Sequence, residues 1–177
     1  MFITKVNKIS IEKRELTERD CTSGDLEMLV AFQKRVRDCM KIRNNWRLFF
    51  AKDFAEILKK NDSIKLYYDG DTFVGFSILE VNHQRDLKKH RVEDLPGEQT
   101  AIVAGFMFAP EYWGNKLQQQ LLCDMEETPR AKGLRYMLTM VAPSNKYSYD
   151  NFVNAKYRTI VDDMFIGGRR LILAKVL

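Results

Sequence analysis

Cysteine and histidine are scarce in this chain, and their scarcity argues against several kinds of site. Among 177 residues there are three cysteines and two histidines. Cys21, Cys39 and Cys123 lack the CxxC spacing of zinc ligands, and only His83 and His90 are available to complete a metal site with them. We therefore predict no metal, and reduced thiols of the kind found in the cytoplasm.

Long apolar runs and concentrated charge are also missing. No stretch reaches the ~20 apolar residues of a membrane-spanning helix, and residues 1–5 lack the apolar centre of a signal peptide. The 29 Lys and Arg residues are interspersed with 24 Asp and Glu residues, which gives a net charge of +5 but no basic tract. We expect a cytoplasmic protein, a monomer or homodimer, without a membrane or nucleic-acid partner.

The chain does contain enough apolar material for one core. At 177 residues and 45% hydrophobic composition, it suits a single domain over residues 1–177 better than two domains. Alternating apolar residues predict a first strand over residues 8–16. Apolar residues at helical spacing predict helices over residues 26–39 and 45–60.

Two hairpins are predicted by their turn residues. Asp69-Gly70-Asp71 separates strand-like residues 64–68 from 72–80, and Gly167-Gly168 separates residues 158–165 from 169–176. The first hairpin is followed by a charged connection over residues 81–99, a length that is typical either of a functional loop or of a disordered segment.

A strand, loop and helix occur twice in the middle of the chain. Residues 100–109 form an apolar run that ends at Pro110, and helical spacing resumes at Leu117 and runs until Pro129. A second run over residues 134–142 ends at Pro143 and precedes a helix over residues 147–156. Two such units predict a parallel strand pair whose ends face a helix N-terminus, a common place for a phosphate-bearing ligand.

This order of elements resembles the GNAT superfamily of N-acetyltransferases over nearly the whole chain. The most specific match is Phe106-Met107-Phe108-Ala109-Pro110-Glu111-Tyr112, which is similar to the family's fourth strand and its lead into the pyrophosphate loop. A second match is Val141-Ala142-Pro143-Ser144-Asn145, followed by Ser148. The resemblance implies a single α/β domain, GNAT-like, with a mixed central sheet of about seven strands flanked by helices.

The resemblance also implies acetyl-CoA as co-substrate and a set of residues that bind it. These are Phe106, Met107, Phe108, Trp113, Gly114, Asn115, Lys116, Leu117, Gln118, Asn145 and Ser148. The family's loop pattern, Q/RxxGxG/A, falls on Trp113, Lys116 and Gln118, and all three depart from it. A Cβ at a glycine position hinders close approach of the backbone to phosphate, whereas Lys116 adds a positive charge beside it. Alternatively, Lys116 and Gln118 are only the solvated side of a helix.

Acetyl transfer also requires groups that move protons. Glu80, at the end of a predicted strand, is our candidate base, and the alternative is a solvated strand end. The family's thiolate-protonating tyrosine falls on Phe152, which has no proton to donate, so we consider Tyr149, one helical turn earlier, as the acid. Tyr149 is alternatively a packing aromatic. A backbone amide near Phe108 is expected to stabilise the oxyanion.

These residues predict an N-acetyltransferase that moves acetyl directly from acetyl-CoA to a primary amine. The absence of the tyrosine and of both loop glycines favours a rival interpretation, a catalytically weak or inactive GNAT-like module that binds acyl-CoA or a protein partner and has a regulatory role. A third interpretation, a nucleic-acid-modifying acetyltransferase, requires a continuous basic surface, for which residues 34–43 and 88–91 supply cations.

Overall fold

The computed structural model describes the chain apart from residues 1, 8–9, 61, 82–86, 93 and 166. Seven strands form one mixed sheet in the order β3-β4-β5-β6-β7-β9-β8, in which β6 and β7 are parallel and the other neighbours antiparallel. The strands are β3 (Thr17–Asp20), β4 (Ser63–Asp69), β5 (Thr72–Glu80), β6 (Thr100–Phe108), β7 (Tyr136–Val141), β8 (Arg158–Phe165) and β9 (Gly168–Val176). The expected α/β class, both hairpins and the parallel pair are confirmed.

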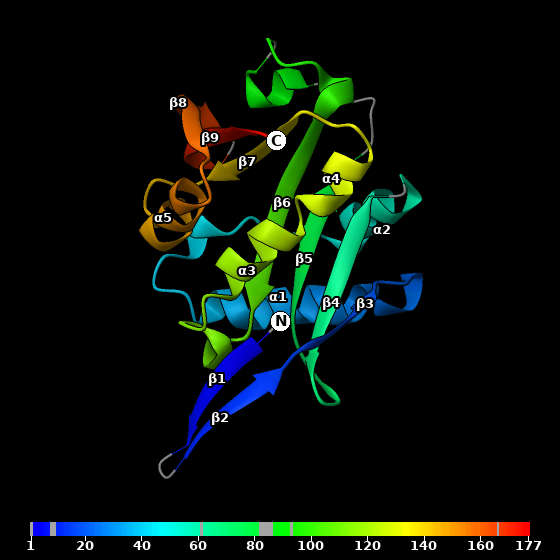
Figure 1. Ribbon diagram of the computed structural model, residues 1–177, viewed down its shortest axis with the longest axis vertical. Coiled ribbons are helices and arrows are strands. Elements are labelled where there is room, and N and C mark those ends of the chain that lie inside the picture. The colour runs from blue at the N-terminus through cyan, green and yellow to red at the C-terminus, as the bar shows by residue number, and fades with distance from the viewer. Residues whose placement is uncertain (1, 8–9, 61, 82–86, 93, 166) are drawn as a thin grey trace.

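The first strand prediction is wrong in its bounds. Instead of one strand over residues 8–16, β1 (Phe2–Asn7) pairs antiparallel with β2 (Ser10–Glu15) in a separate two-stranded sheet, which projects from the body of the molecule (Figure 1). The chain then enters the main sheet as β3, whose residues are exposed along its edge. The alternation that predicted a strand continues across this change of sheet.

Helices cover both faces of the sheet. They are α1 (Leu26–Asp38), α2 (Ala51–Lys59), α3 (Leu117–Asp124), α4 (Glu127–Ala131) and α5 (Lys146–Asn154). In Figure 1, α3 and α4 cross in front of β5 and β6, and α1 lies behind the sheet. Side chains on β6 alternate between the faces: Ala101 and Val103 pack with residues of α3 and α5, whereas Ile102 packs with Leu87 and Val92 of the 81–99 connection.

The predicted helix over residues 45–60 begins later than expected. A 3₁₀ turn, η2 (Arg43–Asn45), and an extended segment over residues 46–50 precede α2, which starts at Ala51. The start is fixed by Asp53, whose carboxylate accepts the Phe50 amide at 2.7 Å. Likewise, Pro129 lies inside the first turn of α4 and does not end a helix, because a proline there removes no intrahelical hydrogen bond.

The parallel strands β6 and β7 separate before they end. Their paired residues run only from Thr100 with Tyr136 to Val103 with Thr139, although β6 continues to Phe108 and β7 to Val141. The hydrogen bond from Thr139 Oγ1 to the Val103 carbonyl oxygen, at 3.0 Å, lies at the last paired position. A gap therefore opens between the strand ends, and it faces the start of α3 and the start of α5.

The end of α5 gives a test of backbone strain. The Lys156 amide donates to the Val153 carbonyl oxygen and the Tyr157 amide to the Phe152 carbonyl oxygen. The Tyr157 and Phe152 rings pack with their centroids 5.0 Å apart. These contacts define a Schellman motif, in which Lys156 has the left-handed position at φ +72°. Gly133 has the same role after α4, also at φ +72°. We expect Lys156→Gly to raise the free energy of unfolding by about 1 kcal/mol and Tm by about 2–4 °C. Gly133→Lys should lower both, and a Tm unchanged in Lys156→Gly would contradict this account.

Candidate active site

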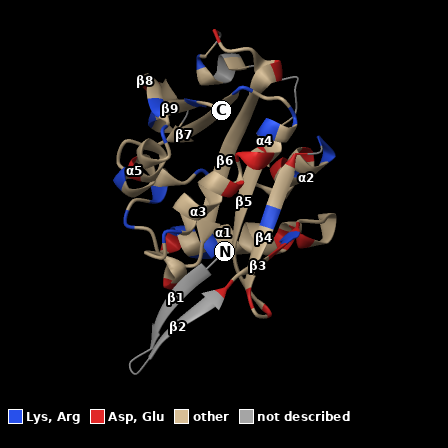
Figure 2. Cartoon of the chain, in the orientation of Figure 1, with Lys and Arg blue, Asp and Glu red and all other residues tan. Residues whose placement is uncertain are grey.

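A cavity of about 1320 Å³ occupies the gap between the ends of β6 and β7. Its wall is formed by the second half of β6, the 113–118 loop, the end of β7 and the start of α5. On its other side lie η2, the extended 46–49 segment, α2, and the turn between β8 and β9. Figure 2 shows Lys, Arg, Asp and Glu spread over most of the elements around it.

The 113–118 loop presents backbone groups to this cavity. Its anchors are Tyr112, whose hydroxyl donates to Asp69 Oδ2 at 2.9 Å, and Trp113, whose indole nitrogen donates to the Phe108 carbonyl oxygen at 2.9 Å. Leu117 and Gln118 are the first residues of α3, and amides at that position have no acceptor within their own helix. An anion at this place would meet those amides and the positive end of the helix dipole.

Lys116 keeps a backbone conformation that glycine adopts most easily. It is the N-cap of α3 at φ +57° and ψ +21°, in the left-handed region, and Gly114 precedes it at φ +84°. Lys116 therefore occupies a backbone conformation that a glycine at this position could adopt without strain. A Cβ built on Gly114 meets no atom within 4 Å, so the loop leaves open space on that side.

Asn145, Ser148 and Gln118 meet across the opening between α3 and α5. Asn145 Oδ1 accepts the Ser148 amide at 3.3 Å and so caps α5, while Gln118 Nε2 donates to Ser148 Oγ at 3.0 Å. Asn151 Nδ2 in turn donates to Gln118 Oε1 at 3.0 Å. Asn145, Ser148 and Gln118 all line the cavity, and the hydrogen bonds of the Gln118 amide to Ser148 and Asn151 link α3 to α5.

The structure brings most of the predicted site residues to one place. Phe106, Met107, Phe108, Trp113, Gly114, Asn115, Lys116, Leu117, Gln118, Asn145, Ser148 and Glu80 all line the cavity. Tyr149 does not. Its hydroxyl accepts from Thr159 Oγ1 at 3.5 Å, on the side of β8, and its role as acid stays a prediction. Phe152, by contrast, lines the cavity and is 2% exposed.

Sequence reasoning missed the opposite wall. Gln33 is fully buried on α1, and its Oε1 accepts the Trp46 indole N–H at 3.2 Å and the Phe49 amide at 2.9 Å, while its Nε2 donates to the Phe49 carbonyl oxygen. This side chain holds the extended segment against the cavity. Gly105 makes room for it, because a Cβ there would lie 2.7 Å from the Trp46 ring. A glycine inside a strand and a glutamine on a buried helical face were the available signals.

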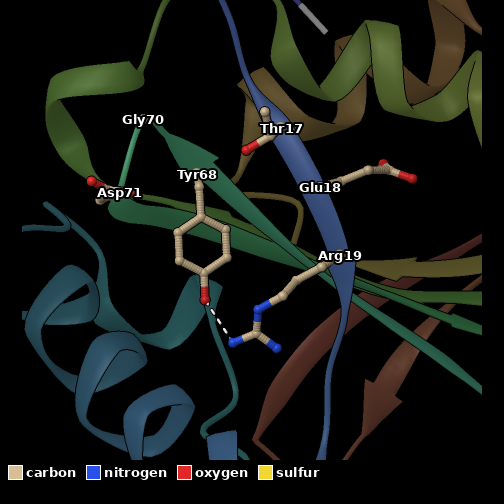
Figure 3. A pocket seen from close by; sticks show the side chains of 6 residues that line it. All are labelled: Thr17, Glu18, Arg19, Tyr68, Gly70 and Asp71. Carbon is tan, nitrogen blue, oxygen red and sulfur yellow. Dashed lines mark hydrogen bonds between the residues drawn. The ribbon is translucent and has the colours of Figure 1, made fainter.

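A second, smaller pocket of about 280 Å³ lies at the β3–β4 edge (Figure 3). Arg19 is its central cation, but its guanidinium already donates to both carboxylate oxygens of Asp25 at 2.7–2.8 Å and to the Tyr68 hydroxyl at 2.8 Å. The hydrogen bonds from Arg19 to Asp25 hold the pKa of the Asp25 carboxyl well below its usual range. The pocket therefore reflects an ion pair that ties β3 to the start of α1.

Comparison with known proteins agrees with this architecture. The model of the acetyltransferase (GNAT) family matches residues 29–152, and the chain belongs to that family. A search of curated proteins finds no match. Among the described residues, no helix is long and apolar enough to cross a membrane, and no group of three His, Cys, Asp or Glu side chains is arranged to hold a metal ion.

Solved structures share the fold at low identity. A GNAT-family acetyltransferase from Listeria monocytogenes has a TM-score of 0.73 at 13% identity, with 93% of this chain and 96% of that chain covered. One from Streptococcus pneumoniae has a TM-score of 0.67 at 18% identity, with coverage of 92% and 100%. YncA, a putative acetyltransferase from Salmonella typhimurium solved with its cofactor acetyl-CoA, has a TM-score of 0.65 at 12% identity, with coverage of 92% and 94%.

Proposed function

We propose that this protein binds acetyl-CoA in the cavity between β6 and β7 and transfers its acetyl group directly to a primary amine. The observation that supports this most is the convergence of three segments on one cavity: the 113–118 loop, the unpaired end of β6, and the Asn145 cap of α5. These segments come from two separate strand–loop–helix units. They line one cavity because β6 and β7 separate after Val103 and Thr139.

The residues suit the parts of such a ligand. Amides at the start of α3, with the Lys116 ammonium beside them, are suited to a pyrophosphate. The unpaired edge of β6 beyond Val103 offers backbone groups to an extended amide-bearing arm. An amide near Phe108 would stabilise negative charge on the oxygen of the thioester that acetyl-CoA supplies.

Proton removal from the amine is assigned to Glu80. The register pairs Glu80 with Ile102, four residues before Phe106 on β6, which corresponds to about 13 Å along the strand. A carboxylate at that distance acts through water, so we propose a chain of water molecules in the cavity between Glu80 and the amine. Tyr149 stays our proposed acid for the departing thiolate, to be tested by substitution.

A matched pair of glycines tests the loop. Gly114 and Gly70 both have positive φ and open space beside them, but only Gly114 lines the cavity. Alanine at either should cost a similar amount of stability, about 1–3 kcal/mol. We expect Gly114→Ala to weaken acetyl-CoA binding about tenfold or more, by blocking a phosphate hydrogen bond, and Gly70→Ala to leave it unchanged. Calorimetric titration of both variants measures this, and equal affinities would exclude the loop as the phosphate site.

The alternative is an acyl-CoA-binding module without catalysis. It is favoured by Phe152, which places a phenyl ring where an acid would stand, and it shares the cofactor site proposed above. Release of free CoA in the presence of a panel of primary amines separates the two. Amine-dependent release with acetylated product supports the enzyme, and tight acetyl-CoA binding without release supports the module.

A further inference from the structure

We propose that the acceptor amine carries a nearby anionic group, a carboxylate or phosphate, which Arg37, Lys41 and Arg170 bind. These three residues lie at the part of the cavity formed by η2, its flanking residues and the β8–β9 turn, which we call the mouth. This inference rests on the proposed function and specifies its acceptor class. It is derived from how η2 is held over the cavity and from the charges that this contact gathers there.

Two arginines converge on adjacent carbonyl groups of η2. Arg37, from α1, donates its Nε hydrogen to the Arg43 carbonyl oxygen at 3.1 Å. Arg170, from β9, donates from Nη2 to the Asn44 carbonyl oxygen at 3.0 Å. Both side chains line the cavity, so segments far apart in the sequence place two guanidinium groups at one part of its rim.

A third contact fixes the same turn to the strand end. Ser144, just after β7, donates from Oγ to Asn45 Oδ1 at 2.5 Å. The connection between α1 and α2 is therefore attached to α1, to β9 and to the loop after β7. The rim is held in place before any acceptor arrives, which reduces the entropy lost when one binds.

Charge at this mouth has one sign. In η2, its flanking residues and the β8–β9 turn, the charged residues that line the cavity are Arg37, Lys41, Arg47 and Arg170. Within the part of the chain that the structure describes, none of these four forms an ion pair with a carboxylate. Nearby acids are paired with other cations: Asp38 with Arg43 at 3.4 Å, and Asp162 with Arg169 at 2.6 Å.

The cavity's carboxylates lie elsewhere. Asp53 and Glu56 belong to α2, Asp62 directly precedes β4, and Glu80 ends β5. Lys60, after α2, also lines this part, so that four carboxylates face one ammonium group there. Asp53 Oδ2 accepts the Phe50 amide, and Asp62 Oδ1 accepts the Val81 amide at 2.6 Å. The cavity thus has an acidic side and a cationic mouth, a distribution that suits a ligand carrying both charges.

The sheet register places the mouth at the same level along the strands as the reacting part of β6. Val103 pairs with Thr139, and Thr139 pairs with Leu173. Val103, Thr139 and Leu173 therefore form one row across the three strands. Phe106 lies three residues beyond this row on β6, and Arg170 lies three residues beyond it in the same direction on β9. Both are about 10 Å past the row. The anionic group would therefore lie near the level of the thioester along the strands, across the gap between β6 and β7.

A cationic mouth also affects the amine itself. Positive charges nearby disfavour the ammonium form, so an amine held there loses its proton more readily. The same field repels a ligand whose only charges are positive and attracts one with an anion. The anion therefore supplies the binding, and the cations that it does not pair with assist deprotonation.

Amines with and without an anionic group test the proposal. We compare 3-aminopropanoate with butylamine, 4-aminobutyrate with 1,4-diaminobutane, and phosphoethanolamine with ethanolamine. We expect at least one anionic amine to show kcat/KM about tenfold or more above its counterpart. Lys41→Gln and Arg170→Gln should remove that preference through KM. Lys34→Gln, on an exposed part of α1 outside the cavity, should keep it.

The outcomes separate this inference from the proposed function. Faster acetylation of neutral or cationic amines overturns the inference and leaves the acetyltransferase standing. If no amine is acetylated, calorimetric titration of the anionic amines into the acetyl-CoA complex decides. Binding that Lys41→Gln abolishes supports the anion site without catalysis, and absence of binding contradicts it. Lys41 makes no hydrogen bond among the described residues, so Lys41→Gln is expected to keep the fold. It therefore tests the anion site even if Arg170→Gln, which loses the hydrogen bond to Asn44, fails to fold.

Discussion

Replacing Phe152 with tyrosine should raise the turnover of acetyl transfer, and by about a hundredfold where Tyr149 supplies no proton, because it places a proton donor at the position that matches the family's tyrosine. Phe152 is 2% exposed, lines the cavity, and packs against Phe106 and Tyr157 with ring centroids 6.1 and 5.0 Å apart. Tyrosine adds a single oxygen to this ring. The measurement is kcat with a saturating amine, alongside Tm to show that the fold is kept.

Tyr149→Phe is the matched control, one helical turn away. If Tyr149 already supplies the proton, this change lowers kcat, and Phe152→Tyr adds less. If the Tyr149 hydroxyl serves only its contact with Thr159, kcat does not change. Equal rates in the parent and both variants would exclude proton delivery from α5 as the limiting step, since CoA is a fair leaving group without assistance.

Gln33→Leu should cost about 3 kcal/mol of unfolding free energy or more and lower Tm by about 6–12 °C. Leucine fills a similar volume but leaves the Trp46 N–H, the Phe49 N–H and the Phe49 carbonyl oxygen without their partner. The extended segment they belong to forms the wall opposite the 113–118 loop. We therefore also expect KM for the amine to rise more than the Kd for acetyl-CoA. Thermal denaturation and steady-state kinetics measure the two effects.

Gln118→Leu provides the comparison. Its loss leaves the half-buried Ser148 hydroxyl and one N–H of the buried Asn151 amide without their partner, instead of three groups around Gln33, so it should cost less, about 1–2 kcal/mol. Similar Tm values for the two variants would show that the Gln33 hydrogen bonds do not hold the segment.

Local sequence patterns predicted most strands of the main sheet well. They missed the β1–β2 hairpin and the start of α2. Asp69-Gly70-Asp71 and Gly167-Gly168 determine turns within a few residues, and the apolar runs around Pro110 and Pro143 determine a parallel pair. The β1–β2 hairpin was missed because alternation continues through it. The start of α2 was missed because Trp46 and Phe49 have helical spacing, although their hydrogen bonds go to Gln33 on another helix.

The candidate site was predicted on one side only. The 113–118 loop and Asn145 belong to contiguous motifs, so their residues could be read from the chain. Gln33, Trp46, Gly105 and Arg170 come from α1, the segment before α2, β6 and β9, and they meet only through the sheet order. Arg170 was not predicted because Asn44, whose carbonyl oxygen it hydrogen-bonds at the mouth, lies 126 positions earlier.

Binding of acetyl-CoA tests the central claim most directly. At about a hundred times its Kd, the ligand should stabilise the folded protein by roughly 2.7 kcal/mol and raise Tm by about 5–10 °C. The same titration with Gly114→Ala should show a smaller rise at equal ligand concentration. A Tm that does not move at millimolar acetyl-CoA would contradict the assignment of the cavity between β6 and β7 as an acetyl-CoA site.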